Sequence, residues 1–211
     1  EHFSLRKVVE QVTELFSPAL ENKKLDFNTY YDPTIPEMLL GSQTAIYRIL
    51  LNLVGNAVKF TKEGGVSIHV AVSKISEAER IAIVKLMVKD TGIGIPKNKQ
   101  QVIFEQFTRL TPSYQGIYSG SGMGLFAVRR LVKLLHGELY VDSEEGEGSE
   151  FTVILPLQMP LLESSEYQKN SLDYRYEPIK VRKVKLKNAD TSVVSSVHQA
   201  VPKIPLKILL V

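Results

Sequence analysis

Apolar residues recur along this chain at two different spacings, and the spacing separates predicted helices from predicted strands. Apolar positions three or four residues apart predict helices over residues 4–20, 43–59 and 123–135. Ser4 is expected to cap the first helix, and Gly137 to stop the last one. Runs rich in β-branched and aromatic residues predict strands over residues 25–31, 66–74, 81–89, 138–142 and 150–155. A short helix is expected after Pro96, ending near Phe104.

The order of these elements predicts the fold class. A helix, a strand, a helix, two strands, a helix and two strands follow one another over residues 1–158. Strand hairpins separated by single helices favour an α/β (α+β) two-layer sandwich, in which a mixed sheet carries the helices on one face. We therefore expect one domain over residues 1–158.

The periodicity ends near Pro160, and the charge changes with it. From Pro160 onward there are nine Lys and Arg against five Asp and Glu, while the rest of the chain holds 17 against 18. The net charge of +3 therefore belongs to the tail. We interpret residues 159–205 as a linker, partly docked, rather than as a nucleic-acid surface, because a solvated linker is the commoner explanation of such a basic excess. A short apolar run, residues 206–211, follows it.

The composition excludes several classes of protein. Hydrophobic residues make up 44% of the 211, which is ordinary for a soluble globular chain. No apolar run approaches the roughly 20 residues of a membrane span. Cysteine is absent, which excludes disulfides and thiolate sites and is compatible with the cytoplasmic location that we expect. The four histidines are scattered without metal-ligand spacing.

Three short motifs carry the candidate chemistry. The first is the helical stripe of Asn52, Asn56 and Lys59, which share one face because they lie four and three residues apart. An asparagine amide oxygen is a ligand suited to Mg²⁺, and a lysine at this spacing can reach a phosphate. Taken alone, the stripe is equally compatible with a solvated helix face.

The second motif is Asp90-Thr-Gly-Ile-Gly-Ile-Pro, at the end of an apolar strand. A carboxylate at such a strand end can accept the amino hydrogen of adenine, and Gly92 and Gly94 would let the backbone approach a ligand closely. By itself the motif is also compatible with an ordinary turn.

The third motif, residues 120–125, leads directly into the last predicted helix. Backbone N–H groups at a helix start can bind phosphate oxygens, although a flexible hinge explains the glycines equally well. Phe104 and Phe107 bracket the start of a long polar loop, and Arg109 follows within reach of a phosphate. The three motifs in series favour a nucleotide site over the ordinary explanation of each.

In this order, the motifs resemble the catalytic ATP-binding domain of sensor histidine kinases, in the GHKL ATPase superfamily with its Bergerat-type fold. Residues 52–59 resemble the N box, 90–95 the G1 box, 104–107 the F box and 120–125 the G2 box. The glycine motif at 146–151 and the final strand at Leu155-Pro156 also match. The resemblance covers about residues 3–158.

The resemblance implies a role for each box in binding ATP and Mg²⁺. Asn56 would ligate the metal with Asn52 assisting, while Lys59 and Arg109 would contact phosphates. Asp90 would bind the adenine amino group. The residues expected to shape the pocket, to border the lid over residues 108–121 or to meet the phosphates are Gly92, Gly94, Ile95, Phe104, Phe107, Ser121, Gly122, Met123, Gly124 and Leu125.

The identity of residue 52 separates two reaction classes. Related ATPases of the gyrase, chaperone and mismatch-repair type carry a Glu at this place to activate water. Asn52 cannot take a proton at neutral pH, so we expect a phosphotransferase rather than a hydrolase. A non-catalytic nucleotide-binding or scaffold module and an autonomous ATPase remain the alternatives.

The resemblance also implies partners. No His-Glu/Asp-x-x-Thr-Pro motif occurs in the chain, so the phosphoacceptor histidine and its dimerisation domain are expected upstream or on another chain. Residues 206–211 resemble the first strand of a response-regulator receiver domain, which suggests a hybrid kinase and a fragment of a longer protein. Whether the longer protein is anchored in the inner membrane stays open.

Overall fold

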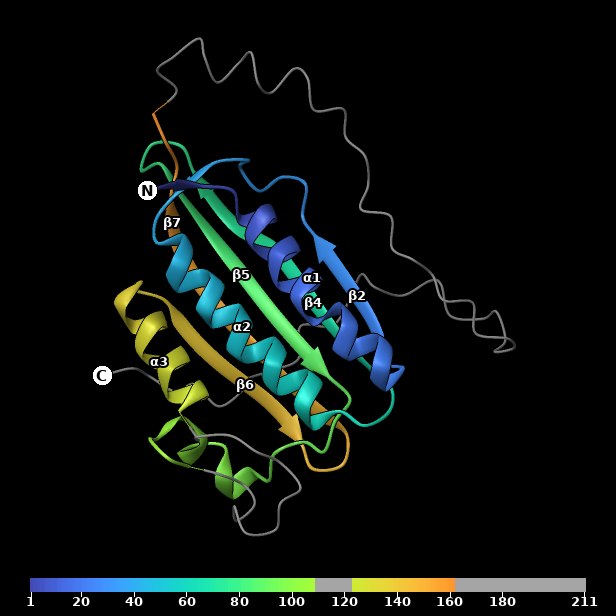
Figure 1. Cartoon of the computed structure of the whole chain (residues 1–211). Helices are drawn as coiled ribbons and strands as arrows, with labels where there is room; N and C mark the ends of the chain where they lie inside the picture. The colour runs from blue at the N-terminus through green and yellow to red at the C-terminus, as the bar shows by residue number, and fades with distance from the viewer. Residues whose placement is uncertain (109–122, 162–211) are drawn as a thin grey trace, which may run out of the picture. The chain divides into compact units, whose positions relative to one another are not determined.

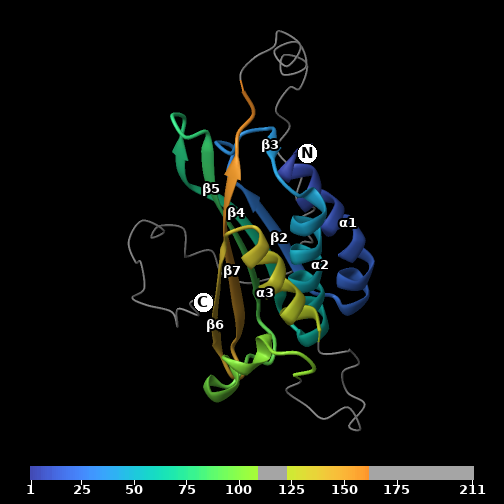
Figure 2. The same cartoon turned by 90° about the vertical axis from the view of Figure 1, so that its left-hand side faces the viewer.

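The computed structural model of this chain describes residues 1–108 and 123–161. These residues form a mixed sheet with three helices on one of its faces, as the side view in Figure 2 shows. The helices are α1 (Leu5–Lys23), α2 (Gln43–Phe60) and α3 (Gly124–Leu134). The predicted two-layer fold is confirmed.

The sheet has the strand order β1-β3-β7-β5-β4-β2, with β6 also pairing with β7. Its long strands are β4 (Gly65–Ser76), β5 (Ile81–Asp90) and β7 (Gly148–Gln158), joined by β2 (Asp26–Tyr31) and β6 (Glu138–Glu144). Only β2 and β4 run parallel among the described strand pairs. The strands β1 (His2–Phe3) and β3 (Leu39–Leu40) were not predicted, because two residues are too few to show a period of two.

Serine caps begin the first two helices. The Ser4 hydroxyl accepts a hydrogen bond from the Lys7 N–H at 3.4 Å, and the Ser42 hydroxyl accepts one from the Ala45 N–H at 3.3 Å. Each cap satisfies a backbone donor that has no partner inside the helix. The predicted starts of both helices are therefore confirmed.

The end of α3 differs from the expectation. His136 takes the left-handed backbone conformation, with φ of 54°, and Gly137 does not. The N–H groups of His136 and Gly137 bond back to Lys133 and Val132, which is the usual pattern for a helix stop. Glycine is needed at 137 for space instead, because a Cβ there would lie 2.5 Å from the Ile154 carbonyl oxygen.

The helix expected after Pro96 is also different. The chain forms two short 3₁₀ turns, η1 (Lys97–Lys99) and η2 (Val102–Phe104), instead of one continuous helix. In the described ranges, no helix is both long and apolar enough to cross a membrane. The expected lid from residue 109, the linker from residue 162 and the receiver-like strand at 206–211 lie outside the described residues.

The core lies between the sheet and the three helices. α2 is the central helix and buries the most side chains of the three. β5 is the central long strand; it contacts α2 and runs between α1 and α2 in the view of Figure 1. β5 alternates buried and partly exposed residues along its whole length, so one face of the strand points to the helices. This pairing of α2 with β5 positions the residues of the candidate site.

Candidate functional site

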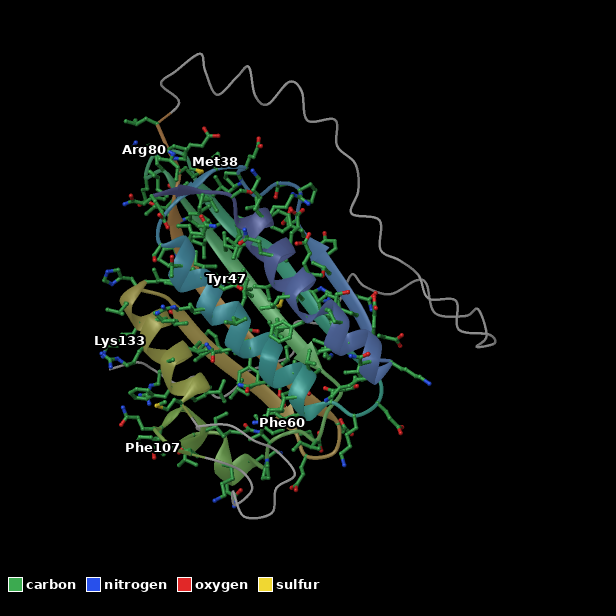
Figure 3. The ribbon with its side chains drawn as sticks, viewed as in Figure 1. Met38, Tyr47, Phe60, Arg80, Phe107 and Lys133 are labelled. Atoms are coloured by element: carbon green, nitrogen blue, oxygen red, sulfur yellow. The ribbon has the colours of Figure 1, made fainter. Side chains whose placement is uncertain are left out.

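The chain segments that carry the three motifs meet at one end of the domain. α2 ends there, β5 ends there, and α3 begins there (Figure 1). Phe60 and Phe107 mark this end in Figure 3, whereas Met38 and Arg80 mark the opposite one. Residues far apart in the sequence therefore come together at this end.

Asp90 lies on the core side of the sheet. It continues the alternation in which β5 buries Ala82, Val84, Leu86 and Val88, and it is only 6% exposed. Burial raises the pKa of the Asp90 carboxyl, while hydrogen bonds from the Gly92 and Ser149 backbones act in the opposite direction. No ion pair to Asp90 is found among the described residues. A buried carboxylate without a cation is expensive for the fold and marks a candidate binding group.

The raised pKa of Asp90 has a consequence for stability. The folded state holds the Asp90 proton more tightly than the unfolded state does, because burial disfavours the charge. The free-energy cost of burying the ionised carboxylate is absent at pH values below the ordinary carboxyl pKa. It is fully present above the raised pKa. Asp90 therefore destabilises the fold at neutral pH, which is compatible with a residue retained for binding.

The turn after Asp90 is packed so closely that side chains would not fit. A Cβ on Gly92 would lie 2.6 Å from the Phe60 carbonyl oxygen, and one on Gly94 would lie 1.9 Å from the Glu144 carbonyl oxygen. Gly94 also has a φ of +67°, which favours glycine. The Gly92 N–H donates to the Asp90 carboxylate at 2.8 Å. The turn thus lies between the end of α2 and the end of β6.

The helical stripe lies on the C-terminal half of α2, the helix whose end packs against this turn. Asn52 and Asn56 are half-buried, and the Asn52 amide nitrogen donates to the Arg48 carbonyl oxygen at 2.8 Å. In the described part of the chain, the Asn56 side-chain amide has no hydrogen-bonding partner. The Lys59 ammonium lies 4.7 Å from the centre of the Phe60 ring. α2 contains neither Asp nor Glu, so it supplies no carboxylate base.

The third motif meets the first at the start of α3. A Cβ on Gly124 would lie 2.8 Å from the Asn52 amide oxygen, so the two helices approach closely there. Met123, at the N-cap position, makes no side-chain cap, and Leu125 packs against the core. The first N–H groups of α3 are therefore not satisfied by a side-chain cap. Arg109, Ser121 and Gly122 lie outside the described residues.

Phe104 and Phe107, which follow the second 3₁₀ turn, differ in burial. Phe104 is 1% exposed and meets the Phe151 ring edge-on at 6.3 Å between ring centres. Phe107 is 69% exposed and takes a positive φ of 61°. Phe104 is thus a core residue next to the site, and Phe107 projects from it.

Sequence reasoning missed a polar row behind the turn. Asp90, Ser149 and Ser143 are cross-strand partners on neighbouring strands, and all three are buried. Each occupies the core-facing place in an alternation that is otherwise apolar. A serine in phase with Leu139 and Val141 was the signal that could have identified Ser143 from the sequence.

The side chains near the site could supply few of the ligands of a metal ion, so most of its ligands would be water or phosphate oxygens. In the described residues, no group of three His, Cys, Asp or Glu could hold a metal ion. The Asn56 amide oxygen fits a single protein ligand to Mg²⁺, which commonly keeps waters and substrate phosphates as its other ligands. The chemistry of this donor set is therefore compatible with a Mg²⁺ ion that keeps phosphate oxygens among its ligands.

Comparison with known proteins identifies the family of this chain. The family described as histidine kinase-, DNA gyrase B-, and HSP90-like ATPase matches residues 41–159. The hybrid signal transduction histidine kinase K of Dictyostelium discoideum is 35% identical, over 83% of this chain and 15% of its own length. The sensor histidine kinase RcsC of Escherichia coli is 33% identical, over 74% of this chain and 16% of its own. The chain thus spans less than a fifth of the length of these relatives.

Solved structures show the same architecture. Full-length ShkA in complex with AMPPNP matches with a TM-score of 0.64 and 31% identity, over 76% of this chain and 31% of that one. The mycobacterial sensor histidine kinase MprB matches with a TM-score of 0.57 over 99% of its chain, and at 24% identity this likeness concerns the fold alone. The family match covers more than half of the chain and includes all described site residues. The chain therefore belongs to the family of histidine kinase-, DNA gyrase B- and HSP90-like ATPases.

Proposed function

We propose that this chain is the ATP-binding catalytic domain of a hybrid sensor histidine kinase. It would bind ATP with Mg²⁺ and transfer the γ-phosphoryl group to a histidine outside these 211 residues. One observation carries the proposal: Asp90 is buried without an ion pair among the described residues, at the end of β5 and beside a turn that packs against the end of α2. The start of α3 packs against Asn52 of the same helix. A base-binding carboxylate and two phosphate-facing helix segments are what a nucleotide site requires.

The proposed roles follow the positions of the side chains. The Asp90 carboxylate would accept the adenine amino hydrogen, in a pocket shaped by the turn from Gly92 to Ile95. The Asn56 amide would ligate Mg²⁺, and Lys59 would reach a phosphate. Bound Mg²⁺ would neutralise phosphate charge during the transfer. Arg109 is proposed as a further phosphate contact on sequence grounds alone.

The chemistry of α2 favours transfer over hydrolysis. Asn52 uses its amide nitrogen on the Arg48 carbonyl oxygen, and its amide oxygen faces Gly124. Because an amide cannot accept a proton at neutral pH and α2 carries no carboxylate, the helix offers no group to activate water. The γ-phosphate would thus survive until an external nucleophile arrives. Positioning and charge neutralisation are then the main contributions of the domain.

We infer the partners from the relatives and the tail. The named relatives include hybrid kinases, so we propose a phosphoacceptor histidine domain and a receiver domain in the same longer protein. The apolar run at 206–211 would begin the receiver, after a linker over residues 159–205. ATP is the proposed substrate, so we expect the domain to work in the cytoplasm.

Calorimetry with Mg²⁺ and AMPPNP provides the first test. We expect one-to-one binding that depends on the metal, and we expect Asn56→Ala to lose the metal dependence while its fold stays intact. Gln101→Ala, an exposed substitution outside the proposed site, serves as the control. Tight, metal-dependent binding by Asn56→Ala would refute the ligand assignment.

Transfer is tested by adding a matching histidine hairpin domain in trans. Radiolabelled ATP should yield a phosphate on the hairpin that is stable to alkali and labile to acid, as expected of phosphohistidine. Binding without any such product would favour a scaffold module instead. Rapid release of inorganic phosphate by the chain alone would favour an autonomous ATPase.

A further inference from the structure

A further polar side chain, that of Gln100, reaches the row formed by Asp90, Ser149 and Ser143 behind the turn. Gln100 follows η1 and is only 8% exposed, although glutamine usually lies at the surface. Its amide nitrogen donates to the Ile95 carbonyl oxygen at 3.0 Å and to the Ser143 carbonyl oxygen at 2.8 Å. Both amide hydrogens of Gln100 are therefore used, and both bonds end on main-chain atoms.

The Ser143 hydroxyl completes the contact from the other side. It accepts a hydrogen bond from the Ile95 N–H at 2.8 Å and donates to the Gly148 carbonyl oxygen at 2.8 Å. Its oxygen also lies 3.0 Å from the Ser149 hydroxyl, which is placed to donate to it. One donated and two accepted bonds use the full capacity of a hydroxyl group. The amide hydrogens of Gln100 and the whole hydroxyl of Ser143 are thus used in a buried setting.

Ile95 is consequently held at both of its main-chain groups. Its N–H is bonded to Ser143, and its carbonyl is bonded to Gln100. At the other end of the turn, the Gly92 N–H is bonded to the Asp90 carboxylate. The four residues between Asp90 and Ile95 are therefore fixed at both ends. A network of buried hydrogen bonds makes a rigid support.

We propose that Gln100 and Ser143 are positioning residues that clamp the Ile95 main chain and so hold the Asp90–Ile95 turn in the shape that receives the nucleotide base. This inference rests on the proposed function, because the turn is the proposed base pocket. Neither residue needs to touch the nucleotide. Their effect is to pre-organise the pocket, which lowers the cost of ordering it when the ligand binds.

The matched test compares Gln100→Met with Gln101→Met in the 211-residue chain. Methionine has nearly the length of glutamine but no donor, so Gln100→Met removes both bonds and leaves most of the volume. Gln101 is exposed and adjacent, so the same change there controls for the substitution itself. We expect Gln100→Met to weaken AMPPNP binding in the presence of Mg²⁺ tenfold or more, and Gln101→Met to bind as the wild type does.

Calorimetry separates positioning from a loss of stability. A purely structural role would leave some molecules unfolded, which lowers the apparent stoichiometry but leaves the Kd of the folded fraction unchanged. Positioning raises the Kd at full stoichiometry. Amide hydrogen exchange at Ile95, without nucleotide, should also be faster in Gln100→Met than in Gln101→Met.

A second pair of variants, at Ser143, tests the clamp if Gln100→Met fails to fold. Ser143→Ala removes the hydroxyl, whereas Ser143→Thr retains it, and threonine is well accepted in strands. We expect weak AMPPNP binding by Ser143→Ala and recovery by Ser143→Thr. Equal Kd values for Gln100→Met and the wild type would overturn the clamp and leave the proposed function standing. Absence of AMPPNP binding by the wild type itself would overturn the proposed function, and the clamp with it.

Discussion

Replacing Gly124 by Ala should separate nucleotide binding from stability. The added Cβ would lie 2.8 Å from the Asn52 amide oxygen, which is 0.6 Å short of the 3.4 Å at which ordinary contact begins. The Asn52 amide is tethered by its bond to the Arg48 carbonyl oxygen. Because of this tether, the amide can retreat only by breaking that bond or by leaving its rotamer.

The expected change in stability is small because two effects oppose each other. The lost hydrogen bond and the shifted rotamer cost about 1–2 kcal/mol together. Alanine is favoured over glycine in a helix by up to about 1 kcal/mol, which offsets part of this cost. The free energy of unfolding should therefore fall by about 1 kcal/mol or less. Binding should suffer more, since the displaced amide and the start of α3 both face the proposed phosphate site.

Urea unfolding and calorimetry with AMPPNP and Mg²⁺ measure the two quantities. We expect at least tenfold weaker binding by Gly124→Ala. Gly41→Ala is the control, because its Cβ would meet its nearest atoms at 3.4 and 3.7 Å, which is ordinary contact, and Gly41 lies outside the three motifs. In an Asn52→Ala background the obstacle is gone, so Gly124→Ala should no longer destabilise the fold. Binding at wild-type affinity by Gly124→Ala, or a loss of more than about 3 kcal/mol of stability, would refute the reasoning.

Three further predictions concern single side chains. Burial raises the pKa of Asp90, so the wild type should lose stability relative to Asp90→Asn as the pH rises from about 4 to about 8. Urea unfolding at each pH measures this difference, and parallel pH profiles of the two proteins would contradict it. Phe104→Ala should cost about 3–5 kcal/mol in thermal or urea unfolding, and exposed Phe107→Ala about 0.5 kcal/mol or less; equal losses would show that burial does not decide the difference. Lys23→Met should lower the free energy of unfolding by about 1 kcal/mol, because the Lys23 ammonium donates hydrogen bonds to three main-chain carbonyls at the C-terminal end of α2. An unchanged urea midpoint would show that these bonds add nothing to stability.

Local patterns were sufficient to predict the elements of the fold. The helical stripes and the β-branched runs depend only on neighbours along the chain, and all three long helices and the five longer strands were found where they predicted. The motif residues Asn56, Asp90 and Gly94 were identified for the same reason, since each departs from the local pattern around it. Leu15 shows the limit: it fits the stripe of α1 but is 54% exposed.

Contacts between distant segments could not be predicted in this way. The parallel pairing of β2 with β4, the stop at His136 and the burial of Gln100 each depend on what another segment places nearby. Gln100 has no local signal, because its partners Ile95 and Ser143 lie on a turn and on a strand that follows 43 residues later.

The sequence by itself determined the helices and strands, the two-layer class and the three motifs that indicate a nucleotide site. Only the tertiary structure decided that Asp90 is buried with no cation beside it in the part of the chain that is described, that Gly124 lies against Asn52, and that Ile95 is held from both sides. The physical reason is the range of the interactions. Periodicity and capping act over a few residues, whereas desolvation, close packing and buried hydrogen bonds depend on atoms that only folding brings together.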